Sequence, residues 1–182
     1  QTGTGKTAAF VLPILQRLVH GRRGTIRALI IAPTRELTEQ THQAIGILGG
    51  KTRLRSTSIY GGVSILPQIG ALRRGVDIVS ACPGRLLDHI NRGTINVATV
   101  EVLVLDEADL MFDMGFFPDI KKIVQQLPAR RQTLLFSATM PDDVLSLAKE
   151  TMNHPVRVQI GHIAPADTVA HTFYPVETHL KT

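Results

Sequence analysis

The fold of this chain is decided by Thr2-Gly3-Thr4-Gly5-Lys6-Thr7, which matches the end of the P-loop pattern GxxxxGK(S/T). Glycines let the backbone come close to phosphate groups, and the amides at the start of the following helix favour negative charge. In such a loop Lys6 reaches the β- and γ-phosphates, and the Thr7 hydroxyl binds Mg²⁺. An ordinary Gly-rich turn is the weaker alternative, because a Lys-Thr pair stands at the expected helix start. The stretch therefore predicts a nucleotide-phosphate site.

Beyond this loop, short runs rich in Ile and Val alternate with longer segments of helical period. This is the pattern of βαβ units and of a parallel sheet covered on both faces. We expect strands over residues 27–32, 56–60, 77–80, 101–105, 133–136 and 156–160. We expect helices over residues 6–20, 37–48, 65–73, 85–92, 118–126 and 141–152. The sequence thus predicts an α/β fold of the P-loop NTPase type, mostly parallel, with the strand that normally precedes a P-loop missing from the chain.

A second chemical signal lies where the apolar run from Val102 to Leu105 meets Asp106-Glu107-Ala108-Asp109. An apolar strand that ends in acids places carboxylates at the carboxyl edge of the sheet, where open α/β sheets bind ligands. Asp106 can hold Mg²⁺, usually through water, and Glu107 is placed to orient or deprotonate an attacking water. Acids that merely stabilise a helix N-terminus are an equally good reading of this motif by itself. Together with the P-loop, the catalytic reading is favoured.

The chain also resembles the DEAD-box RNA helicases, because residues 106–109 spell the motif that names the family. Other segments resemble its motifs in the family's order. These are residues 1–7 as motif I, 33–37 as Ia, the Gly61-Gly62 pair, 83–85 as Ib and 137–139 as III. The resemblance implies an RNA-dependent ATPase with a partial RecA-like domain at 1–160, and 161–182 as a tail toward a second RecA-like domain. Met114-Gly115-Phe116 and the tail are similar to bacterial RhlE-type members.

The resemblance further implies an RNA surface that grips the sugar-phosphate backbone with Pro33, Thr34, Arg35, Gly61, Gly62, Pro83, Gly84 and Arg85. The chemistry agrees, because guanidinium groups fit phosphate geometry and a Gly pair lets backbone amides approach. Taken singly, a solvated arginine or a plain turn would be the better reading. Contacts to the backbone carry no sequence information, so little base preference is expected.

Two further segments bear on function. The resemblance implies that Ser137 and Thr139 form hydrogen bonds to the acids, particularly Asp109, and so couple ATP state to RNA binding. A capping site for the next helix is an alternative that can hold at the same time. Cys82 stands where the family usually has Thr, and a thiol is a weaker donor, so RNA affinity should be reduced there.

Composition sets limits on the rest. The 182 residues, with 43% hydrophobic, suit one globular domain. A net charge of +5 and a pI near 9.8 favour a polyanionic partner without requiring one. A single cysteine, Cys82, excludes an internal disulfide, and the apolar runs are far shorter than the roughly 20 residues of a membrane span. We expect an intracellular, cytoplasmic protein with no membrane segment.

Two parts of the family pattern are missing from this sequence, and further expectations follow from that. The upstream motif that recognises adenine and the second domain with its arginine fingers are not in the sequence, so ATP and Mg²⁺ binding are expected but adenine specificity is not predicted. We expect the chain alone to be poorly stable and unable to unwind RNA. Two alternatives are a different P-loop motor, such as a DNA translocase, and a binding domain that does not turn over ATP.

Overall fold

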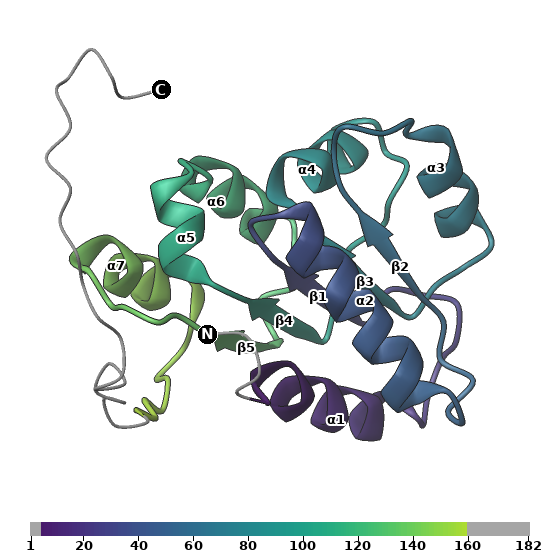
Figure 1. The fold of residues 1–182 in the computed structure, drawn as a ribbon, viewed down its shortest axis with the longest axis horizontal. Coiled ribbons are helices and arrows are strands. Elements are labelled where there is room, and N and C mark those ends of the chain that lie inside the picture. Colours follow the sequence, from purple (N-terminus) through teal and green to yellow (C-terminus); the bar gives the residue numbers. More distant parts are fainter. Residues whose placement is uncertain (1–4, 160–182) are drawn as a thin grey trace, which may run out of the picture.

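The computed structural model describes residues 5–159, so expectations for 1–4 and 160–182 lie outside the described residues. Its centre is a five-stranded sheet in the order β2-β3-β1-β4-β5, with all neighbours parallel (Figure 1). The strands are β1 (Ala28–Ile31), β2 (Ser56–Ile59), β3 (Ile78–Ala81), β4 (Val102–Leu105) and β5 (Gln132–Leu135). The expected parallel α/β sheet is confirmed.

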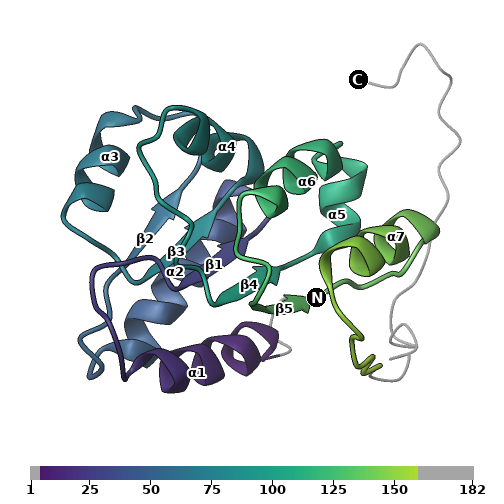
Figure 2. The ribbon, with the colours of Figure 1, turned by 180° about the vertical axis from the view of Figure 1, so that it is seen from behind.

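Helices cover both faces of the sheet, as Figures 1 and 2 show from opposite sides. They are α1 (Lys6–Leu18), α2 (Arg35–Gly49), α3 (Leu66–Arg73), α4 (Pro83–Asn91), α5 (Ala108–Asp113), α6 (Phe117–Gln125) and α7 (Asp142–Thr151). Buried side chains of α1 and α2 pack on one face, and those of α4 to α7 pack on the other. Within the described residues, no helix is long and apolar enough to cross a membrane.

The strands supply two cores by alternating their side chains. Leu29 and Leu103 point to the α4–α7 face, whereas Ile30 and Val104 point to the α1–α2 face. Successive residues of a strand face opposite sides of a sheet, so a strand covered on both sides must be apolar throughout. This is why β1 and β4 are continuous runs of fully buried aliphatic residues.

The structure differs from the expected elements in three places. Residues 156–159 are not a strand, and the side chains of Val156 and Val158 are 88% and 83% exposed. A valine-rich run without a neighbouring strand gains no ladder and no packing, which overrides its propensity. Helix α5 was not predicted, because six residues are too few to display a helical period. The last helix also begins at Asp142, with Pro141 as its extended N-cap.

Candidate functional site at the carboxyl edge of the sheet

The predicted site residues follow the strands and gather at one edge of the sheet. Because all five strands are parallel, the segments that follow them meet at the carboxyl edge. These segments are residues 32–35, 60–62, 82–85, 106–109 and 136–139. Thr2, Gly3 and Thr4 lie outside the described residues. Gly5 is the N-cap of α1 with a φ of 75°, the left-handed conformation that glycine adopts without strain.

Lys6 lies between two carboxylates at the start of α1. Its Nζ is 2.8 Å from Asp106 Oδ1 and 2.9 Å from Glu107 Oε1, across about a hundred residues of sequence. Burial lowers the pKa of Lys6, but the two carboxylates outweigh it and the net pKa is raised. The P-loop lysine and both predicted acids therefore form one cluster, named here the nucleotide cluster together with Asp109, Ser137 and Thr139.

Asp106 is suited to hold a cation. The residue is 2% exposed, and burial raises the pKa of its carboxyl. Its Oδ1 is 2.8 Å from Lys6 Nζ in an ion pair, and no described residue donates an aligned hydrogen bond to this oxygen. Mg²⁺ usually takes one or two carboxylates plus water and phosphate oxygens rather than a complete protein cage. Residues 5–159 contain no set of three acidic, His or Cys side chains that could hold a metal by themselves.

Glu107 adopts an unusual backbone conformation. Its φ and ψ are 58° and 57°, which is left-handed and rare for a residue with a long side chain. Ala108 N–H donates to the Phe136 carbonyl at 3.0 Å, and Asp106 N–H donates to the Ile31 carbonyl at 2.9 Å, so the neighbouring strands fix the turn. Such strain persists where the surroundings enforce it, and here it turns the Glu107 carboxylate toward Lys6.

Asp109 is tied to the segment after β5. Its Oδ2 accepts the Thr139 N–H at 2.9 Å and the Thr139 hydroxyl at 3.0 Å, and its own N–H donates to Ser137 Oγ at 3.1 Å. Burial raises the pKa of Asp109, but the hydrogen bonds from Thr139 and Ser137 outweigh it and the net pKa is lowered. The N-cap of α7 is Pro141 and has no side-chain cap, so the capping alternative for this segment is wrong.

The segment after β1 begins helix α2. Pro33 is buried, and the Thr34 hydroxyl accepts the Leu37 N–H at 3.3 Å as an N-cap. Arg35 is exposed, and its guanidinium lies 4.8 Å from the centre of the Tyr60 ring. A cation over an aromatic face is held weakly at an exposed site. Arg35 thus keeps its hydrogen-bond donors available.

The Gly pair and the segment after β3 lie close to Arg35. Gly61 and Gly62 are exposed, Gly62 has a φ of 76°, and no atom lies within 4 Å of a Cβ added to either. Arg85 donates through both terminal nitrogens to the Val63 carbonyl, at 3.1 and 3.0 Å. Its guanidinium therefore supports the loop that follows the Gly pair. We call Thr34, Arg35, Gly61, Gly62, Gly84 and Arg85 the candidate RNA surface. The other two predicted residues, Pro33 and Pro83, are buried and are not part of it.

Cys82 is the N-cap of α4 but caps nothing with its side chain. Its Sγ lies 3.3 Å from the Thr38 hydroxyl, and burial raises the pKa of the thiol. The thiol is therefore engaged with α2 rather than presented to a ligand. This contact gives Cys82 a small structural role between α4 and α2.

A buried polar network beneath the candidate RNA surface was not predicted. Gln68 Nε2 donates to the Tyr60 carbonyl at 3.0 Å, and its Oε1 lies 3.1 Å from His89 Nε2. On the other side, His89 Nδ1 lies 2.7 Å from the Thr94 hydroxyl. The network fixes Tyr60, which precedes the Gly pair and faces Arg35. The only signal for this network in the sequence was His89, a polar residue on a helix face that is otherwise made by the apolar Leu86 and Ile90.

Comparison with known proteins supports these motifs. The DEAD/DEAH box helicase family model matches residues 1–147. The chain is similar to the DEAD-box ATP-dependent RNA helicase CshA of Geobacillus kaustophilus, at 48% identity over 88% of this chain and 34% of that protein. It is also similar to RhpA of Helicobacter pylori, at 43% identity over 98% and 36%. The chain spans about a third of the length of these relatives.

Solved structures agree on the fold. A DEAD box protein from Methanococcus jannaschii has a TM-score of 0.79 and 47% identity, covering 85% of this chain and 42% of that one. A hypothetical ATP-dependent RNA helicase from Sulfolobus tokodaii has a TM-score of 0.76 and 42% identity, covering 85% and 44%. The expected RecA-like fold is confirmed, whereas the RhlE-type assignment stays a prediction.

Proposed function

Because this chain belongs to the DEAD/DEAH box helicase family, we propose that it is the ATP-binding, RNA-gripping part of an ATP-dependent RNA helicase. The observation that carries the proposal is the meeting of Lys6, Asp106 and Glu107 at the carboxyl edge of the sheet, where a carboxylate oxygen of each acid lies within 2.9 Å of Lys6 Nζ. A cation for phosphate, a buried carboxylate for a metal and a second carboxylate for water are the parts that phosphoryl transfer to water requires.

In this function each residue has one task. Lys6 binds the β- and γ-phosphates of ATP, Asp106 and the Thr7 hydroxyl hold Mg²⁺, and Glu107 orients or deprotonates the attacking water. When bound, Mg²⁺ neutralises charge that develops on the phosphate oxygens. Both carboxylates already lie against Lys6, so phosphates compete with them for the same ammonium group. ATP binding then frees Glu107 from its ion pair for work on the water.

RNA is gripped at the candidate RNA surface. Arg35 and Arg85 supply guanidinium donors for phosphates, and Gly61 and Gly62 offer a backbone with no side chain in the way. Contacts of this kind read no bases. Asp109, bonded to Ser137 and Thr139, links the turn that carries Glu107 to the segment after β5, and this link couples the ATP state to RNA binding.

The proposal includes the chain's wider setting. Residues 1–160 are a partial first RecA-like domain, and 161–182 lead toward a second RecA-like domain that completes the RNA cleft. Unwinding of short RNA duplexes belongs to that complete protein. A cytoplasmic location is supported by the single cysteine, which leaves no pair for an internal disulfide.

The test is Glu107→Gln in the protein that carries this chain. The amide keeps the shape of the side chain but removes the base, so ATP and RNA binding should persist while hydrolysis falls by about 10²-fold or more. Steady-state phosphate release and anisotropy of labelled RNA measure the two. Unchanged turnover would remove Glu107 from the mechanism.

A matched control and a second substrate sharpen this test. Glu150→Gln removes an exposed carboxylate of α7 that pairs with Lys121, far from the nucleotide cluster, and should leave hydrolysis unchanged. ATP hydrolysis should be stimulated by RNA and not by DNA of the same sequence. Equal stimulation by DNA would favour a DNA translocase instead.

A further inference from the structure

The chain's positive charge is concentrated at the edge of the sheet opposite the nucleotide cluster. Residues 19–27, 50–55 and 73–77 lead into β1, β2 and β3, at the lower right of Figure 1. They contain eight of the chain's 20 Lys and Arg residues and one of its 15 acids, Asp77. The remaining 12 basic and 14 acidic residues leave the rest of the chain with a small negative net charge. The pI near 9.8 therefore has a local origin.

Seven of these cations are exposed. They are Arg22, Arg23, Lys51, Arg53, Arg55, Arg73 and Arg74. We call them the amino-edge surface. Their loops contact one another directly, because Arg23 donates to the Thr52 carbonyl at 3.2 Å and Arg55 donates to the Arg74 carbonyl at 2.8 Å. The seven residues thus form one continuous patch rather than a scatter of solvated charges.

A buried carboxylate holds the patch together. Asp77 is 1% exposed, and its two oxygens accept the Gly24 N–H and the Arg55 N–H, both at 2.8 Å. Gly75 packs so closely on Gly24 that an added Cβ would lie 3.0 Å from the Gly24 carbonyl oxygen. The loops are therefore fixed relative to one another, and a ligand would meet a preformed arrangement of charges.

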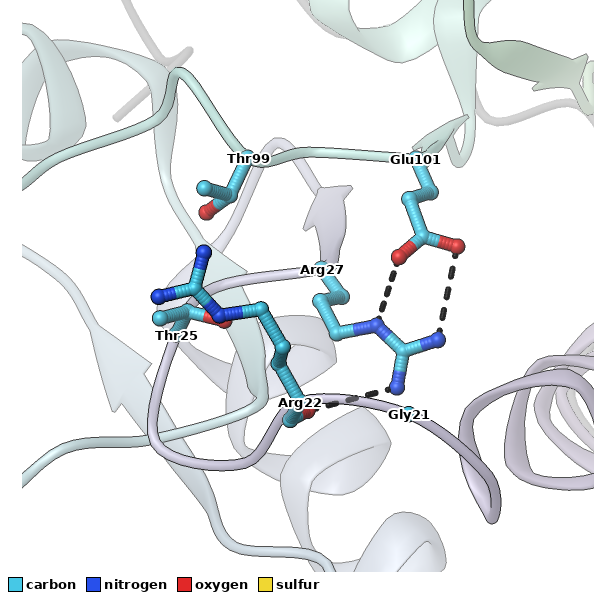
Figure 3. Close-up of a pocket in the computed structure, with 6 residues that line it drawn as sticks. All are labelled: Gly21, Arg22, Thr25, Arg27, Thr99 and Glu101. Carbon is cyan, nitrogen blue, oxygen red and sulfur yellow. Dashed lines mark hydrogen bonds and ion pairs between the residues drawn. The ribbon is translucent and has the colours of Figure 1, made fainter.

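The loop before β1 is fixed from inside by Arg27. Its guanidinium donates to the carbonyls of Leu18 and His20 and pairs with Glu101, with 2.6 Å between Arg27 Nε and Glu101 Oε1. Figure 3 shows this pair on one side of a small pocket and the Arg22 side chain pointing toward Thr99 on the other. The charge of Arg27 is neutralised by Glu101, whereas the side chain of Arg22 points away from this pair.

We propose that the amino-edge surface is a second binding surface for the RNA sugar-phosphate backbone, separate from the candidate RNA surface. Six of its seven cations are arginines, whose forked donors fit phosphate oxygens better than lysine does. Its loops contain no Phe, Tyr or Trp on which a base could stack, so its contacts go to phosphates, which carry no sequence information. This inference rests on the proposed function in taking RNA as the polyanion.

The position of the surface defines what it adds. It lies across the sheet from Lys6 and Glu107, and no residue of the nucleotide cluster takes part in it. Binding there is independent of nucleotide, so it keeps RNA near the protein while the candidate RNA surface grips and releases. Two linked contacts raise the overall affinity through a high effective concentration.

The test compares two triple variants in the protein that carries this chain. Arg22→Gln, Lys51→Gln and Arg73→Gln remove three cations whose side chains have no hydrogen bond or ion pair among residues 5–159. The control triple, Lys122→Gln, Lys149→Gln and Arg157→Gln, removes the same charge from α6, α7 and the segment beyond. Anisotropy of a labelled single-stranded RNA of mixed sequence is measured between about 50 and 200 mM salt.

The amino-edge triple should weaken RNA binding about 10-fold and reduce the slope of log K against log salt by about 2, equally with and without ATP. The control triple should change neither. Equal losses in both triples would assign the effect to net charge and overturn the proposal. Unchanged RNA affinity in the amino-edge triple would also overturn it. So would a result in which the amino-edge surface binds vesicles of anionic lipid but not RNA.

Two further measurements keep the outcome clear. Basal ATP hydrolysis of the amino-edge triple should equal that of the parent, so a failure of this proposal is distinct from a failure of the Glu107→Gln test. Arg53 has a left-handed φ of 60°, a conformation that Asn tolerates, so Arg53→Asn keeps the fold if the triple does not. It should lower the salt slope by about 0.7.

Discussion

The nucleotide cluster and the candidate RNA surface share one edge of the sheet but hold their cations differently. Lys6 is paired with two carboxylates, of which Asp106 is 2% exposed. Arg35 is exposed over the neutral Tyr60 ring, whereas Arg85 is half-buried, donates to the Val63 carbonyl and lies 4.0 Å from Asp88 Oδ2. Removing one member of a buried ion pair strands the other charge, whereas an exposed arginine on a neutral partner is lost at little cost. Substitutions in the cluster should therefore have large effects, and those on the RNA surface small, additive ones.

Lys6→Ala should give the largest effect. It removes the phosphate contact and leaves Asp106 buried without its cation, so ATP hydrolysis should fall on the order of 10³-fold. Steady-state phosphate release at saturating ATP measures the loss. Lys149→Ala, an exposed cation on α7, is the control. Turnover within a few-fold of the parent would break the comparison, because the cluster would then tolerate loss of its central charge.

Thr139→Val should give an intermediate effect. The variant keeps the shape of the side chain but loses the hydroxyl bond to Asp109, while the Thr139 N–H bond is retained. One charge-assisted hydrogen bond is worth about 1.5 kcal/mol or more, so RNA stimulation of hydrolysis should fall about 10-fold with basal hydrolysis little changed. Ser146→Ala on α7 is the control. Equal losses of basal and stimulated rates would show that Thr139 has no coupling role.

Arg35→Gln should give a smaller effect. The side chain is exposed and its contact with Tyr60 is weak, so RNA affinity should fall only about 3-fold to 10-fold with no change in basal hydrolysis. Titration of labelled RNA measures it. Adding Arg35→Gln to the amino-edge triple should give losses that multiply, because the two surfaces share no partner. A loss as large as that for Lys6→Ala would contradict a graded surface.

Much of the fold and of the site was predictable from the sequence. β1 and β4 are fully buried, so their sequences had to be short apolar runs, and residues that follow parallel strands had to meet at one edge. Lys6, Asp106 and Glu107 come together for this reason. The capping alternative for residues 137–139 was wrong, because Thr139 turns back to Asp109 rather than forward to α7.

The rest depends on contacts that leave little local trace. Helix α5 follows a left-handed Glu107 that is enforced by β1 and β5, not by its own six residues. Val156 and Val158 alternate as in a strand but have no partner strand among residues 5–159. Gln68 and His89 are 21 residues apart, and the contact between their side chains explains why both are polar. Such pairings are set by tertiary structure.

His89 gives the smallest expected effect. It is a buried titratable group beneath the candidate RNA surface, where substitutions should have small, additive effects on RNA affinity. Burial lowers its pKa below the ordinary 6.5, and Arg85 and Arg92 add to this while Asp88 opposes it. The unfolded state then binds more protons than the folded state as pH falls below 6.5, so the free energy of unfolding decreases with falling pH from that point.

His89→Gln should remove this pH dependence while keeping a polar group toward Gln68. Between about pH 6.5 and 5.5 the free energy of unfolding should decrease more in the parent than in the variant. The difference should be below about 1.4 kcal/mol and is measured by urea denaturation. His20→Gln, at an exposed imidazole, is the matched control. Since Gln68 connects His89 to the Tyr60 carbonyl, RNA affinity of the parent should fall over the same pH range more than that of His89→Gln. If the parent and His89→Gln showed identical pH profiles of RNA affinity, the network beneath the candidate RNA surface would have only a structural role. The residues of that surface would then contribute to RNA affinity independently of it.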